Sequence, residues 1–169
     1  MSKGDPAKLK KVSVSLPFGL GSAEWEADST QRRAAWALYV ELVTRVAVQE
    51  LASDAGLLRE AMNSLYTLFG TTREILREGG PDVGASRESV GGLAIAVLNK
   101  GLRPFLTKWH PLLQVWETQR PEKMSLKEHE GQWAEEPNLR QELAALRGEL
   151  EVYAQALAKV AGVDNTSRS

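Results

Sequence analysis

The segment 139–160, LRQELAALRGELEVYAQALAKV, decides the fold that we expect for this chain. Its large apolar residues follow one another at alternating spacings of four and three: Leu139, Leu143, Leu146, Leu150, Tyr153, Leu157 and Val160. This spacing places them on one face of an α-helix, and such a face packs against neighbouring helices at small crossing angles. Because Gly162 supplies a C-terminal cap, the pattern predicts a bundle helix over about 138–162.

Working outward from this helix, four further segments show apolar side chains at helical spacing: residues 28–52, 56–79, 86–102 and 104–119. Asp28 and Gln31 have the spacing of a capping box at the start of the first of these segments. Pro104 and Pro111 each remove a backbone donor, so we expect a break or a kink at Arg103, and either a helix with a defect at His110 or two short helices over the last segment. The chain therefore predicts an all-α fold, a four- to five-helix bundle.

Two local features of these helices lead to structural predictions. Gly91 and Gly92 belong to a stretch rich in small residues, which allows a neighbouring backbone to approach closely, so we expect this helix to be the most buried. Glu41 and Arg45 stand four residues apart in a mainly apolar helix and predict an ion pair. A surface pair is the expectation, because a buried pair has a large desolvation cost.

The stretch 12–20, VSVSLPFGL, has a different pattern, with an apolar residue at every second position. Period two is typical of an extended segment, and Pro17 excludes a central strand because proline has no N–H to donate. With no second segment of strand character recognised, we expect an extended arm that lies across the helices or pairs with another chain. Four of its side chains are therefore candidate protein-binding residues: Val12, Val14, Leu16 and Phe18.

Length and composition set the broad class. With 169 residues, we expect one domain over 12–162, a flexible basic tail over 1–11 and a disordered tail over 163–169. A net charge of -1 argues against a protein whose main role is to coat nucleic acid. The absence of cysteine excludes thiolate chemistry and sulfur-based zinc sites and fits a reducing compartment, so we expect a cytoplasmic location. The longest charge-free apolar run, 89–99, is far shorter than the ~20 residues of a membrane span.

Most catalytic and metal-binding signatures are missing from the sequence. It has no phosphate-binding loop, zinc-protease motif, nucleophile elbow or dinucleotide fingerprint, and its two histidines are too few for a multi-histidine metal centre. We therefore expect no cofactor and no metal. The polar stretch 120–137 contains a capping pattern at Ser125 and Glu128 that predicts a single helical turn, with Trp133 as its anchor. We expect His129 and the glutamates around it to be exposed to solvent.

One arrangement has catalytic potential, the pair Arg103 and His110. The two residues stand seven apart, so a regular helix places both on one face. Arginine stabilises the charge that develops on a phosphate in the transition state, and histidine transfers protons near neutral pH. The stretch 103–110, RPFLTKWH, resembles the Arg-x(4–6)-His motif of the HEPN superfamily of all-helical proteins. The resemblance implies a metal-independent endoribonuclease that acts as a homodimer, with these two residues as the catalytic pair and Lys100 and Lys108 as RNA-binding residues.

Trp109 and Trp116 form a second candidate set, since they also stand seven residues apart. Tryptophan is enriched at the centres of protein interfaces, which makes both residues candidates for protein binding. The alternative is that they seal loops onto the bundle core, the more frequent role of a large aromatic side chain.

The function that these patterns favour is a non-enzymatic interaction module. We expect an adaptor or regulatory subunit of a multi-component bacterial system, which binds another protein or a second copy of itself. RNA is the expected partner only in the HEPN-like alternative. A helical module that oligomerises to signal at membranes or to damage them is a third class, but the sequence contains no strongly amphipathic basic helix to favour it.

Overall fold

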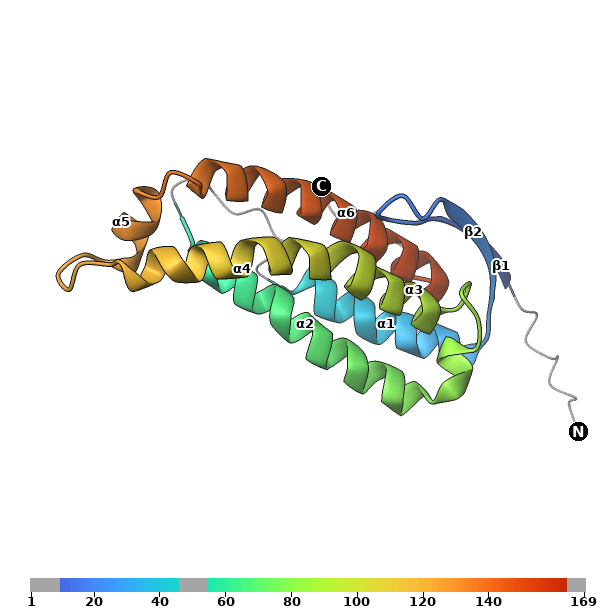
Figure 1. Ribbon diagram of the computed structural model, residues 1–169. Helices are drawn as coiled ribbons and strands as arrows, with labels where there is room; N and C mark the ends of the chain where they lie inside the picture. Colours follow the sequence, from blue (N-terminus) through green and yellow to red (C-terminus); the bar gives the residue numbers. More distant parts are fainter. Residues whose placement is uncertain (1–9, 46–54, 164–169) are drawn as a thin grey trace, which may run out of the picture.

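The computed structural model describes residues 10–45 and 55–163, and these form a helical bundle with a small hairpin at one end (Figure 1). The α-helices are Ser29–Val43 (α1), Leu58–Gly79 (α2), Val90–Ala96 (α3), Arg103–Thr118 (α4), Leu126–Gly131 (α5) and Glu136–Ala161 (α6). A 3-10 turn, η1 (Pro81–Gly84), follows α2, and a π-helical segment, η2 (Val97–Leu102), joins α3 to α4. The predicted all-α class is therefore confirmed.

Helix α6 forms the centre of the core, as the spacing of its apolar residues predicts. All of the residues of the predicted seam are buried: Leu139, Leu143, Leu146, Leu150, Tyr153, Leu157 and Val160. The helix packs mainly along α1, which also packs against α2. Gly162 ends it in the left-handed conformation, with a φ of 75°. The predicted bounds of this helix are thus correct to within two residues.

The extended arm predicted over 12–20 is wrong in its bounds and in its pairing. The chain forms an antiparallel hairpin between Lys10–Ser15 (β1) and Ser22–Ala27 (β2), in which Val12 pairs with Trp25 and Val14 with Ala23. Residues 16–21 form the turn. The second strand also alternates apolar and polar residues, but two of its apolar positions are alanines, whose small side chains give a weak periodic signal. Strand β1 thus pairs with a strand of its own chain. It also includes Lys10 and Lys11, which were predicted to belong to the flexible tail.

The hairpin is part of the same core as the helices. Val14 and Trp25 are buried, and the backbone N–H of Phe18 donates a hydrogen bond of 2.6 Å to Oε2 of Glu149 on α6. The Phe18 ring lies on Gly101 of η2, where a Cβ atom would stand 2.4 Å from the ring. Only a glycine leaves room for this ring, so the hairpin and the π-helical segment fit each other closely.

Of the two alternatives predicted at Arg103, the break does not occur, because helical backbone continues from Val90 through η2 to Thr118, and the irregularity takes the form of a π-helical turn. The π turn directly precedes Pro104, whose missing N–H and bulky ring disfavour a regular α-helical turn there. The helix begins four residues later than predicted, because Ser89 caps it by accepting a hydrogen bond of 3.0 Å from the Gly92 N–H.

Helix α1 ends at Val43, well before the predicted residue 52. The Thr44 hydroxyl donates to the Val40 carbonyl at 2.7 Å, and this carbonyl also accepts the Thr44 N–H at 3.3 Å. Residues 46–52 of the predicted helix lie outside the described residues. Helix α2 begins at Leu58, two residues after its predicted start.

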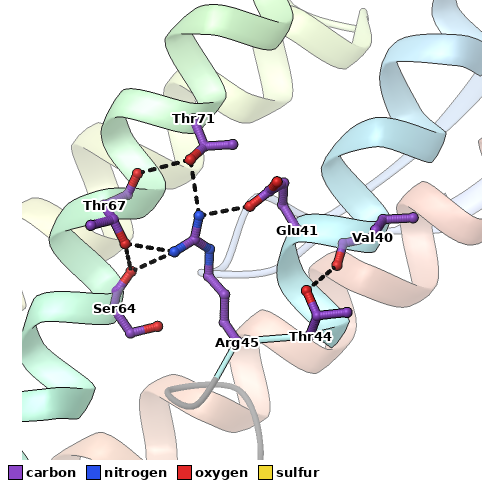
Figure 2. Close-up of polar contacts among 7 residues, drawn as sticks. All are labelled: Val40, Glu41, Thr44, Arg45, Ser64, Thr67 and Thr71. Carbon is purple, nitrogen blue, oxygen red and sulfur yellow. Dashed lines mark hydrogen bonds and ion pairs between the residues drawn. The ribbon is translucent and has the colours of Figure 1, made fainter.

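Arg45 follows this end of α1 and ties it to α2 (Figure 2). Its guanidinium pairs with Glu41 at 2.7 Å, as the spacing predicts, but also donates to the hydroxyls of Thr67 at 2.6 Å and Thr71 at 3.0 Å and to the Ser64 carbonyl at 3.2 Å. The Arg45 side chain is only 14% exposed. The expected ion pair therefore forms, but its arginine lies between two helices and not on the surface.

The polar stretch after α4 folds as predicted at its start, where Ser125 and Glu128 form a capping box for α5. Trp133 is buried and meets the edge of the Trp109 ring, with 6.2 Å between ring centroids. The predicted anchoring of this segment by Trp133 agrees with these contacts.

The expected exposure of His129 and Glu130 is wrong, since both are buried. The His129 ring stacks on Trp116 with 4.3 Å between centroids. The Glu130 carboxylate accepts the backbone N–H of Leu58 at 2.9 and 3.0 Å and so caps the first turn of α2. Both residues are buried because they contact other helices, His129 through Trp116 of α4 and Glu130 through Leu58 of α2.

Candidate functional site

Helix α4 presents the predicted catalytic residues and Lys108, one of the two predicted RNA-binding residues, on two different flanks. Arg103 and His110 face α2, which runs beside α4 in Figure 1. Lys108 and Trp109 contact Glu142 and therefore face α6. The predicted residues thus belong to two separate surfaces.

On the α2 side, His110 is held by an arginine and a tyrosine. Nδ1 of His110 lies 3.0 Å from a terminal nitrogen of Arg59, and because a guanidinium only donates, Nδ1 is the acceptor in this contact. Arg59 also forms an ion pair of 2.6 Å with Glu117. The ring of Tyr66 meets His110 edge-on, with 5.2 Å between centroids, and is 41% exposed.

Arg103 lies two helical turns away from His110 and shares an aromatic ring with a second arginine. The guanidinium carbons of Arg103 and Arg73 stand 5.3 and 5.8 Å from the centroid of the Phe69 ring. Arg103 also donates to Oδ1 of Asn99 at 3.2 and 3.3 Å. Within residues 10–45 and 55–163, neither arginine has a carboxylate oxygen within 4.0 Å. Two cationic groups are therefore gathered on one ring without a counter-charge from this part of the chain.

We call this surface the arginine–aromatic face; it consists of Arg59, Tyr66, Phe69 and Arg73 of α2 and Arg103, His110 and Glu117 of α4. Arg59 contacts residues late in α4, whereas Phe69 contacts a residue at its start, so the two helices run antiparallel. Arg103 and His110 stand about 10 Å apart along the helix axis, at 1.5 Å per residue. They lie on one flank, as their spacing predicts, but no contact joins them within one chain.

Lys108 does not contribute to this face. Its ammonium group lies 4.7 Å from the centroid of the Trp109 ring and bonds to Oε1 of Glu142, whose other oxygen accepts the Trp109 N–H at 2.7 Å. The hydrogen bonds from Lys108 and Trp109 lower the pKa of the Glu142 carboxyl. Lys100, the other predicted RNA-binding residue, is exposed on η2.

A groove of about 180 Å³ separates α4 from the first turns of α6. Its walls are formed by Lys108, Trp109, Leu112, Glu135, Asn138, Gln141 and Glu142. Leu112 is 46% exposed, and Val115, one turn further along α4, is 59% exposed. We call this surface, with Val115 included, the α4–α6 groove.

The side chains that were predicted to bind a protein partner are buried or half-buried in this fold. Val14 and Trp109 are buried, while Val12, Leu16, Phe18 and Trp116 are half-buried. The indole N–H of Trp116 donates to the His129 carbonyl at 2.8 Å, and this contact holds α5 against α4. The contacts of both tryptophans agree with the alternative in which they seal neighbouring segments onto the bundle.

Sequence reasoning did not identify the residues of α2 that complete the arginine–aromatic face. Arg59, Tyr66 and Arg73 recur at seven-residue spacing, which puts them on one flank of a helix. That signal shows that the three share a flank, but their proximity to Arg103 and His110 depends on packing between distant segments.

Comparisons with known proteins give no relative from which a function could be transferred: no family model, curated protein or solved structure matches the chain. The HEPN resemblance therefore rests on the segment 103–110 alone. Among the described residues, no group of three or more histidines and carboxylates is arranged to hold a metal ion. In the same part of the chain, no helix has the length and hydropathy needed to cross a bilayer.

Proposed function

We propose that this protein is a cytoplasmic, non-enzymatic interaction module, an adaptor or regulatory subunit, and that it binds an amphipathic helix of a partner protein in the α4–α6 groove. The observation that carries this proposal is the exposure of Leu112 and Val115, two large apolar side chains one turn apart beside a groove. Apolar contacts at this spacing are what a helix lying in a groove requires.

The groove also has a polar rim that favours one kind of helix. Glu135 and Glu142 lie on its α6 side; Glu142 is already paired with Lys108, so Glu135 supplies the negative charge that a partner helix would meet. A partner helix with leucine-like residues at positions i and i+3 or i+4, and with lysine or arginine beside them, would match both the apolar floor and the acidic rim. Trp109 also lines this groove, but its ring is buried, so the exposed apolar contacts are those of Leu112 and Val115.

This proposal predicts a partner whose binding depends on the groove. The wild type, the double variant Leu112→Asp/Val115→Asp and the control Ile95→Asp are used to capture proteins from native extract. Ile95 is 50% exposed but lies on α3, so its variant tests whether any charge added to an apolar surface position weakens binding. We expect one protein to be retained by the wild type and the control and, once purified, to bind the double variant at least tenfold more weakly.

Thermal unfolding of all three proteins shows whether the substitutions leave the fold intact. Exposed positions tolerate polar residues, so we expect closely similar midpoints. A purified partner that binds the groove variant and the wild type equally well would exclude the groove as the docking site.

The HEPN-like endoribonuclease is a second candidate, favoured by the placement of Arg103 and His110 on one flank of α4, with Arg59 and Tyr66 beside the histidine. It predicts RNA cleavage in the presence of EDTA that His110→Ala abolishes without loss of folding. Lys127→Ala is the matched control, because Lys127 is an exposed lysine of α5 that is not among the residues assigned to RNA, and it should retain full activity. Cleavage that persists in His110→Ala, or that requires a divalent metal, would exclude this mechanism.

A further inference from the structure

The arginine–aromatic face is a long strip in which cationic and aromatic groups alternate. Along α2, Arg59, Tyr66 and Arg73 follow one another at intervals of seven residues, which corresponds to about 21 Å from the first to the last. Arg103 and His110 of α4 lie along the same strip. The strip is therefore long enough to contact several repeating units of an extended polymer.

The charges of this strip are not balanced. Glu117 is the single carboxylate among the residues that define the face, and Arg59 already holds it at 2.6 Å. Arg73 and Arg103 share the Phe69 ring and form no ion pair within the described residues. Two positive charges thus remain available to an anionic ligand, on guanidinium groups whose flat donor sets match phosphate oxygens.

The aromatic side chains of the strip indicate which class of anionic ligand it binds. The ring of Tyr66 is 41% exposed and makes a T-shaped contact with His110, one turn of α2 away from Phe69. A ring presented beside unpaired arginines can stack on a nucleobase while the arginines contact the adjoining phosphates. An acidic peptide would use the same charges but would leave the ring without a flat partner.

We infer that the arginine–aromatic face binds single-stranded nucleic acid, with Arg73 and Arg103 on the phosphates and Tyr66 stacked on a base. A duplex is excluded as the ligand, because its bases are already stacked and paired and cannot reach Tyr66. This inference rests neither on RNA cleavage nor on the partner proposed for the α4–α6 groove. Since the groove lies on the opposite flank of α4, both ligands can be bound at the same time.

The binding of a fluorescein-labelled 12-nucleotide DNA strand of mixed sequence, followed by anisotropy in 50 mM salt, tests this inference. DNA lacks the 2′-hydroxyl that metal-independent RNA cleavage requires, so binding is measured without turnover. We expect Arg73→Ala/Arg103→Ala to weaken binding at least tenfold and to reduce the slope of log K against log salt by about 1.4, the value for two phosphate contacts to a single strand.

Substitutions of Tyr66 separate stacking from charge. Tyr66→Ala should weaken binding about tenfold, whereas Tyr66→Phe, which keeps the ring, should bind as the wild type does. The matched charge control is Arg87→Ala/Lys127→Ala, which removes two exposed cations away from the face and should leave the affinity within twofold. Thermal unfolding of every variant verifies that the fold is retained.

Several results would overturn the inference. One is a wild type that fails to bind the strand in 50 mM salt, and another is a charge control that loses as much affinity as the Arg73 and Arg103 variant. The third is a blunt-ended duplex without unpaired bases that binds as tightly as the single strand. A polyglutamate peptide that displaces the strand, combined with a Tyr66→Ala variant of unchanged affinity, would instead assign the face to an acidic protein segment.

Discussion

Replacement of Gly92 by alanine should lower the free energy of unfolding by about 3 kcal/mol or more. This is the largest effect on stability that we expect from any of the substitutions considered. A Cβ atom at this position would stand 2.3 Å from the Ser86 carbonyl oxygen and 2.9 Å from that of Arg87. Both atoms belong to the backbone, so no side-chain rotation can relieve the overlap. Helix α3 would have to move away from the loop that precedes it.

Gly148 supplies the matched control for this prediction. It lies inside α6, is exposed, and has no atom within 4 Å of the position of an added Cβ. Gly148→Ala should therefore stabilise the protein by about 0.5–1 kcal/mol, because alanine loses less backbone entropy than glycine in a helix. Urea denaturation of both variants measures the difference. Equal stabilities of Gly92→Ala and the wild type would contradict the prediction, because they would show that the loop with Ser86 and Arg87 moves aside without a cost in free energy.

Glu130→Ala should cost about 2–3 kcal/mol, the second-largest effect that we expect. The Glu130 carboxylate accepts the N–H of Leu58, a fully buried residue at the start of α2, and its loss leaves that donor without a partner. Glu130→Gln retains an acceptor oxygen at the same place and should recover most of the loss. Urea denaturation near pH 7 compares the two variants, and equal losses would contradict a capping role.

The same residue predicts a pH dependence of stability. Burial raises the pKa of Glu130 and outweighs the Leu58 hydrogen bond and the positive charge of Arg140, which lower it. The folded state therefore holds this proton more tightly than the unfolded chain does. Its stabilising effect is complete below the ordinary pKa of 4.5 and is lost as the pH rises through the raised value.

This contribution can be isolated by subtraction. The free energy of unfolding of the wild type, measured relative to Glu130→Gln, should fall as the pH is raised from 4.5. The glutamine variant has no proton to lose at this position, so the other carboxyl groups cancel in the difference. A constant or rising difference would contradict a raised pKa at Glu130.

The fold was predicted where one segment alone contains the information. The apolar stripe of α6 is unbroken over many turns, so its helix, its buried face and its end at Gly162 all follow from local spacing. The hairpin was missed because β2 presents Ala23 and Ala27 at two of its inward positions, and their small side chains hide the period of two. The π turn before Pro104 was not predicted, because a proline in a helical sequence is as compatible with a break or a kink as with a π turn.

The candidate site was predicted only in part, for a related reason. The seven-residue spacing of Arg103 and His110 correctly places both on one flank of α4, since it is a property of a single helix. Their neighbours Arg59 and Tyr66 come from α2, and nothing local in either helix specifies which flanks meet. The burial of Glu130 was missed for the same reason, since its partner is the N–H of Leu58, far away in the sequence.

The π-helical segment η2 has a geometric consequence for both surfaces of α4. Each residue added to or removed from a helix turns everything beyond it by about 100° about the axis. The length of η2 therefore sets the rotational phase in which α4 leaves α3. With one residue fewer in this turn, Arg103 and His110 would rotate away from α2, and Leu112 would leave the groove beside α6. The separation of the arginine–aromatic face and the α4–α6 groove on opposite sides of α4 thus depends on one irregular turn, which packs against the ring of Phe18.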